Sequence, residues 1–129
     1  MSAIVTVQDA LRDLAAGGQL YHEFIRHESL STGLYHLPAG QADPQRPHTE
    51  DEVYYVLAGT GEIEIEGVVT PIGPGSVIFV AKLARHRFQN YPEGLTLLVI
   101  FAPARGSQAA SPAASPAASP APSPAASPT

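Results

Sequence analysis

The chain has 129 residues, a formal net charge of −5 and no cysteine, which excludes disulfide bonds, thiolate metal sites and cysteine nucleophiles. Its seven basic residues, all arginines except Lys82, are scattered without a stripe or an arm, so we expect no nucleic acid partner. No apolar stretch is long enough to cross a bilayer, and the N-terminus lacks the pattern of a secretory signal. We therefore expect no membrane partner and a cytoplasmic location.

Composition divides the chain at about residue 106. Residues 1–106 suit a single domain with one apolar core. Residues 107–129 form a low-complexity segment which, from Ala109 onward, contains only Ala, Ser and Pro before a final Thr. Such a segment has no large apolar side chain to offset the entropy of ordering, so we predict a disordered tail or a semi-rigid spacer. The alternative is a recognition segment modified at its Ser-Pro sites.

One helix is predicted near the start of the chain. Apolar residues recur there at helical spacing: Val7, Ala10, Leu11, Leu14 and Ala15. Thr6 is a suitable N-cap, with Asp9 three residues later, and the pair Gly17-Gly18 ends the helix.

From Leu20 onward the pattern changes to a period of two, which indicates strands. The expected strands are 20–27, 30–37, 53–57, 62–66, 68–72, 77–80, 85–89 and 95–101. We expect a bulge at Gly33 and a hairpin turn at Gly59-Thr60-Gly61. Short strands separated by Gly and Pro turns indicate an all-β fold, with the jelly-roll β-barrel as the leading candidate.

Two histidines and a carboxylate suggest a metal site: His48, Glu52 and His86. On one continuous strand, residues four apart lie about 13 Å apart at ~3.3 Å per residue, so His48 and Glu52 can share an ion only if the chain bends between them. The polar triplet Thr49-Glu50-Asp51 suits such a bend. We expect His48 to end one strand, Glu52 to begin the next, and His86 to come from a neighbouring strand.

Imidazole and carboxylate ligands suit a divalent Fe, Mn, Zn, Ni or Cu ion. A site with no thiolate and with open positions is more often catalytic than structural. The alternative is a surface or hydrogen-bonding role for each of these side chains.

The spacing of these residues resembles the paired motifs of the cupin family, G-x5-H-x-H-x3–4-E-x6-G and G-x5-P-x-G-x2-H-x3-N. Gly40, His48, Glu52 and Gly59 fall at positions of the first motif (about 40–59), and Gly75, His86 and Asn90 at positions of the second (about 75–90). The resemblance implies a cupin-type β-barrel, commonly a homodimer. It also implies a metal ion held by the motif histidines and glutamate.

Two departures from the motifs stand out. Arg46 replaces the first motif histidine, and a guanidinium cannot ligate a cation. Gln45 could supply a weak neutral fourth ligand, or Arg46 could pair with a substrate carboxylate beside the metal. Ala81-Lys82-Leu83 replaces the Pro-x-Gly of the second motif, so the loop before His86 is expected to have another shape.

For the residues near this site, the first interpretation is a structural role in the core, in a turn or on the surface. Tyr54 shares the face of Glu52 on a regular strand and could line the interior, although core packing is the commoner role. Glu50 and Asp51 are expected to be solvated turn residues rather than a general base. Asn90 is expected to be a turn residue. The other strand histidines, His22, His27 and His36, are expected to be exposed or hydrogen-bonded. Surface positions are expected for the basic residues near His86, which are Lys82, Arg85 and Arg87, although they could attract an anionic substrate.

These observations predict a metal-dependent enzyme acting on a small polar molecule, either neutral or anionic. Oxygenation is the first expectation, because non-haem iron oxygenases use two histidines and a carboxylate on one face of the metal. Isomerisation and decarboxylation are the next candidate reactions. The alternative is a non-catalytic module that binds or senses a small ligand with the same barrel.

Overall fold

The computed structural model describes residues 3–108, which contain one helix and eight strands, as the sequence predicts. In chain order the elements are α1 (Val7–Gly17), β1 (Tyr21–His27), β2 (Leu30–Leu37), β3 (Asp51–Ala58), β4 (Gly61–Ile65), β5 (Val68–Ile72), β6 (Val77–Val80), β7 (His86–Gln89) and β8 (Leu95–Ala102). Most of the predicted low-complexity tail, from residue 109 onward, lies outside the described residues.

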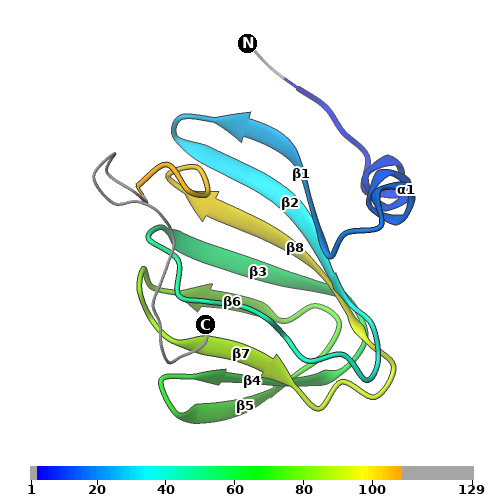
Figure 1. The fold of residues 1–129 in the computed structure, drawn as a ribbon, viewed down its shortest axis with the longest axis vertical. Helices are drawn as coiled ribbons and strands as arrows, with labels where there is room; N and C mark the ends of the chain where they lie inside the picture. Colours follow the sequence, from blue (N-terminus) through cyan, green and yellow to red (C-terminus); the bar gives the residue numbers. More distant parts are fainter. Residues whose placement is uncertain (1–2, 109–129) are drawn as a thin grey trace.

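The strands form two antiparallel sheets (Figure 1). The larger sheet has the strand order β1-β2-β8-β3-β6, and the smaller has the order β5-β4-β7. Inward side chains of both sheets meet in one core, which includes Leu97 and Val56 from the larger sheet and Ile63 and Phe88 from the smaller. This two-sheet arrangement agrees with the predicted jelly roll.

Helix α1 covers part of the outer face of the larger sheet, beside β1 and β2 (Figure 1). The Thr6 side chain accepts a hydrogen bond from the Asp9 backbone N–H, and the C-cap Gly18 has a left-handed conformation. Ala10 and Leu14 pack with Leu34 in a second apolar cluster. The helix prediction and its caps are therefore confirmed. Within residues 3–108, no helix is long and apolar enough to span a membrane.

The predicted hairpin at Gly59-Thr60-Gly61 is wrong. β3 belongs to the larger sheet and β4 to the smaller, so this segment carries the chain from one sheet to the other. Gly59 has φ +92°, and a Cβ there would collide with the Gly94 carbonyl oxygen. These glycines therefore permit a close crossing between the sheets. A true hairpin follows at Glu66-Gly67, where both residues have positive φ and β4 pairs with β5.

The predicted bulge at Gly33 is also wrong. Gly33 pairs regularly with Glu23 and with Val99, and the register shift lies on β1 between Glu23 and Ile25. The Tyr21 side chain lies against Gly33, where a Cβ would collide with its ring. The glycine makes room for this tyrosine in the barrel interior.

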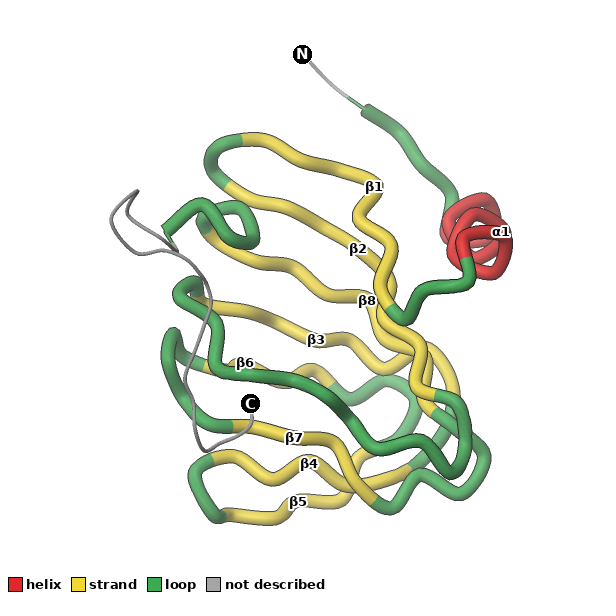
Figure 2. The backbone as a smooth tube through the Cα atoms, viewed as in Figure 1, coloured by secondary structure: helices red, strands yellow, loops and turns green. Residues whose placement is uncertain are grey.

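The segment between β2 and β3 contains no strand. Figure 2 shows it as a long green loop that crosses the molecule before β3 begins. His48 therefore lies in a loop and does not end a strand, contrary to our expectation. Glu52 is the second residue of β3, close to the expected strand start.

Candidate metal centre

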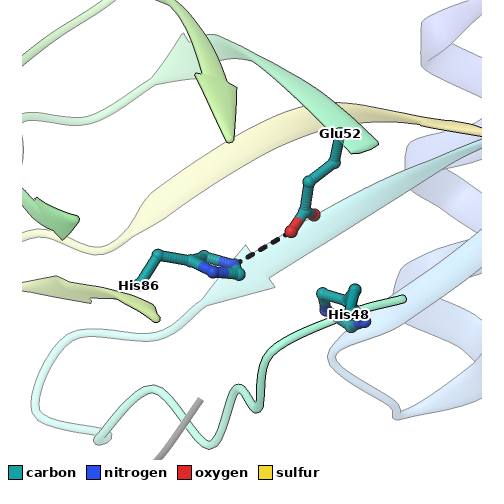
Figure 3. A group of neighbouring side chains, drawn as sticks. All are labelled: His48, Glu52 and His86. Atoms are coloured by element: carbon teal, nitrogen blue, oxygen red, sulfur yellow. Dashed lines mark ion pairs between the residues drawn. The ribbon is translucent and has the colours of Figure 1, made fainter. Parts of the chain in front are cut away.

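His48, Glu52 and His86 come together in the interior between the sheets. One ligand atom from each lies within 4.8 Å of the others (Figure 3). The chain bends at Thr49 and Glu50, as the spacing requires, and this bend brings His48 back towards Glu52. His86 is the first residue of β7 and reaches the site from the smaller sheet, opposite Glu52.

Backbone contacts determine which nitrogen of His86 faces the site. Its Nδ1 lies 3.1 Å from the Ala84 carbonyl oxygen. A carbonyl oxygen only accepts, so this contact assigns a proton to Nδ1 and leaves a lone pair on Nε2. Such a backbone contact is the usual way in which a ligating histidine is oriented.

The Glu52 carboxylate has an unusual environment for a buried charge. The residue is only 2% exposed, and neither of its oxygens has a geometrically acceptable hydrogen bond within the described structure. Oε1 lies 3.0 Å from Nε2 of His86, which is the separation of an ion pair. With Nδ1 already protonated, this contact is stable only if a second proton or a cation lies between the two lone pairs.

Gln45 and Tyr54 complete this group of polar atoms. The Tyr54 hydroxyl donates to Gln45 Oε1 at 2.7 Å and lies 3.0 Å from Nε2 of His86. Gln45 Oε1 is itself 3.1 Å from Nε2. The structure therefore brings Gln45 and Tyr54, both singled out in the sequence, beside His86.

The donor set fits a divalent cation. Two imidazoles, a carboxylate and an amide oxygen are ligands that first-row transition metals accept. Within residues 3–108, the Glu52 carboxylate has no hydrogen-bond donor that a metal ion would have to displace. The residues present can therefore hold the kind of ion that the sequence motifs imply.

Burial and the Glu52 carboxylate determine the acid–base properties of the site. Burial lowers the pKa of His48, and the Glu52 charge offsets this only in part. Burial is the largest single influence on the pKa of His86 and acts to lower it, but the Glu52 carboxylate, the Ala84 carbonyl and Asp43 together raise the net pKa. Burial raises the pKa of Tyr54 well above its usual value, so the phenol is protonated in the metal-free protein.

Arg46, which occupies the position of the missing motif histidine, lies on the surface. Its side chain is exposed and forms no ion pair with any described residue. The preceding residue, Gln45, reaches the interior instead.

The prediction that Glu50 is a solvated turn residue is wrong. Glu50 is 2% exposed, and its carboxylate accepts hydrogen bonds from the backbone N–H groups of Gly106 and Gln108, both at 3.0 Å. It therefore anchors the segment that follows β8. Asp51 is exposed, as expected, and accepts a hydrogen bond from the Lys82 backbone N–H.

Two residues near the site were missed by sequence reasoning. Asp43 is buried in the irregular loop and accepts hydrogen bonds from the Tyr35 hydroxyl, the Phe88 backbone N–H and the Gln45 side chain. Arg105 follows β8 and lies over aromatic rings. No periodic pattern or motif position marks either residue in the sequence.

The remaining polar residues singled out in the sequence do not belong to the cluster of His48, Glu52 and His86. Asn90 has φ +54° and its side chain donates to Glu62, as expected for a turn residue. Exposed or half-buried positions are found for His22, His27, His36, Lys82, Arg85 and Arg87.

Residues 33–101 match the family model described as the cupin domain. The chain is 40% identical over 89 residues to an uncharacterized protein of Streptomyces coelicolor, covering 69% of this chain and 85% of that protein. It is 30% identical over 86 residues to the dimethylsulfoniopropionate lyase DddQ of Ruegeria pomeroyi, covering 66% of this chain and only 41% of the lyase.

Solved structures show the same fold. The crystal structure of that lyase superposes with a TM-score of 0.60 at 27% identity, over 68% of this chain and 47% of the lyase chain. A conserved Klebsiella pneumoniae protein with a double-stranded β-helix domain superposes with a TM-score of 0.66 at 20% identity, over 80% of this chain and 91% of that one.

Proposed function

Because the chain belongs to the cupin domain family, we propose that His48, Glu52 and His86 bind one divalent metal ion in an enzyme that acts on a small polar molecule. The observation that carries this proposal is the buried Glu52 carboxylate, which accepts no hydrogen bond from residues 3–108 and lies 3.0 Å from an imidazole nitrogen. A cation satisfies both groups at once. The candidate ions are Fe, Mn, Zn, Ni and Cu.

Gln45 is the fourth ligand in this proposal. Its amide oxygen lies 3.1 Å from Nε2 of His86, and it replaces the first motif histidine with a neutral oxygen donor. A set of two nitrogens and two oxygens favours a borderline metal over a thiophilic one.

We place proton transfer ahead of the oxygenation that the sequence first suggested. The phenol of Tyr54 lies 3.0 Å from Nε2 of His86, where it can exchange a proton with a bound substrate. One similar protein is named as a dimethylsulfoniopropionate lyase. Both observations favour a non-oxidative reaction such as an elimination or an isomerisation.

The proposed step is an elimination from a small carboxylic acid that carries a leaving group on its β carbon. A bound divalent ion would supply a positive charge that opposes the burial that raises the pKa of Tyr54. The Tyr54 phenolate takes the proton from the α carbon, and the C–H electron pair forms the double bond. The leaving group departs from the β carbon with its bonding pair. Before the phenol ionises, the Gln45 amide oxygen accepts its hydrogen bond and positions the Tyr54 side chain.

The test is turnover of β-substituted propionates, beginning with dimethylsulfoniopropionate, followed by proton NMR without oxygen. We expect vinyl protons to appear with metal-loaded protein and not with Tyr54→Phe, which keeps the ring but removes the hydroxyl. Turnover that requires oxygen would restore the oxygenase hypothesis. Ligand binding without turnover in any form would favour the non-catalytic binding module. The homodimer and the cytoplasmic location stay predictions.

A further inference from the structure

Arg105 is linked to the candidate metal centre through aromatic rings. Its guanidinium carbon lies 4.9 Å from the centre of the Tyr21 ring and 5.9 Å from that of Phe101. The Phe101 ring centre is in turn 4.9 Å from that of the His48 imidazole. One aromatic side chain therefore separates a permanent positive charge from a candidate metal ligand.

The backbone that presents Arg105 is held in place. Its N–H donates to the hydroxyl of Ser31, which is fully buried, at 2.9 Å. The preceding Ala104 is buried, and the following Gly106 is bound by Glu50. Because its segment is anchored and its guanidinium lies over two aromatic rings, the Arg105 side chain loses little conformational entropy when it binds a ligand.

No carboxylate neutralises Arg105 within residues 3–108. Arg12, Arg26 and Arg87 each pair with an acidic residue, whereas Arg105 pairs with none. Glu50 is occupied by backbone N–H groups. Arg105 is exposed as a residue, and no described acidic side chain occupies the N–H donors of its guanidinium.

The charge of Arg105 acts on the interior groups. Burial raises the pKa of Tyr21, and Arg105 opposes that rise. Arg105 therefore contributes a positive potential at the end of the barrel where His48 lies.

We propose that Arg105, stacked on Tyr21 and Phe101, is the anion-binding residue that selects carboxylate substrates for the site at His48. A guanidinium fork matches a carboxylate in geometry, and the stacking directs its edge to the ligand. A single cation near Glu50 and Glu52 suits a monoanion better than a phosphate dianion. This proposal names the residue that recognises the carboxylate of the substrates proposed above, and it rests on the proposed function for the orientation of the substrate towards the metal.

Arg46 is the rival for this role and serves as the matched control. It is also an exposed arginine without an ion pair, and it precedes His48 by two residues. Unlike Arg105, it stacks on no ring among the described residues.

The experiment titrates propionate, propionamide and inorganic phosphate into the full-length 15N-labelled protein, in metal-free and zinc-loaded forms. Side-chain Nε–H signals report ligand contact with each arginine, and zinc stoichiometry is measured alongside. We expect propionate to shift the Arg105 signal and to bind about tenfold or more weakly to Arg105→Gln. Arg46→Gln should bind propionate like the wild type, and propionamide and phosphate should bind more weakly than propionate. Zinc stoichiometry should be the same in all three proteins.

Equal propionate affinity in Arg105→Gln and the wild type would overturn the proposal. A loss confined to Arg46→Gln would also overturn it and assign the role to Arg46. If no form binds zinc, the proposed metal function fails, while the metal-free titration still decides the role of Arg105.

Discussion

Asp43 accepts a hydrogen bond from the side-chain nitrogen of Gln45 at 2.9 Å, and this contact fixes the orientation of the Gln45 amide. A carboxylate only accepts, so the amide NH2 must face Asp43 and the amide oxygen must face Tyr54 and His86. Asp43 is 6% exposed and also accepts from the Phe88 backbone N–H, which ties it to β7. The side chain that would replace the missing histidine is therefore held in a ligating orientation before any ion binds.

Gln45→Ala should weaken zinc binding by about tenfold, because it removes one neutral oxygen ligand while three ligands stay. Gln45→Glu should not bind zinc more tightly than the wild type, because its second oxygen would face the Asp43 carboxylate in place of the donating amide NH2. Competition with a chromophoric chelator measures both affinities. Unchanged affinity in Gln45→Ala would show that the ion, if bound, does not use this side chain.

Glu50→Gln should loosen the segment that follows β8. The carboxylate accepts two backbone N–H bonds, and the substitution removes its charge and replaces one acceptor with a donor, at a cost of about 1–3 kcal/mol in the free energy of unfolding. Hydrogen exchange should quicken at the amides of Gly106 and Gln108. Asp51→Asn is the control, because Asp51 is exposed and accepts from Lys82 alone. Equal exchange in both variants would contradict the anchoring role of Glu50.

Gly33→Ala should be strongly destabilising, by about 2 kcal/mol or more, because overpacking shifts a ring or the backbone. A Cβ at this position would lie 2.7 Å from the His22 carbonyl oxygen and closer still to the Tyr21 ring. Gly17→Ala is the matched control in the last turn of α1, where a Cβ meets nothing within 4 Å. Helix propensity predicts that this second change stabilises by up to about 1 kcal/mol. Chemical denaturation compares the two, and equal stabilities would contradict the packing described for Gly33.

Most strands were predictable from the sequence, because the alternation of apolar and polar residues and the glycines in turns are local signals. Ile63 on β4 follows this alternation and is buried. The pairing of strands into sheets is set by contacts distant in sequence, so Gly59-Thr60-Gly61 was mistaken for a hairpin. The same three-residue segment suits a turn within one sheet or a crossing between two.

The convergence of His48, Glu52 and His86 was predictable from the spacing of the two motifs. The bend between His48 and Glu52 then follows, because these two residues can share an ion only if the chain bends between them. The burial of Glu50 and Asp43 could not be predicted in this way. Each is an acidic residue in a polar segment, and burial depends on whether the tertiary fold brings backbone N–H groups to its oxygens. Arg105 lies beyond both motifs, and only the return of the chain over Tyr21 and Phe101 brings it near the site.

The central claim is that this site binds a divalent metal ion, and elemental analysis of the untagged full-length protein tests it most directly. The matched variant is the double substitution His48→Ala, His86→Ala, with its folding checked by thermal melting. We predict about one metal ion per chain in the wild type and none in the variant, because two of the four ligands are lost. No metal in the wild type, together with failure to bind added Fe, Mn, Zn, Ni or Cu, would contradict the account and leave the Glu52–His86 contact as a proton-sharing pair.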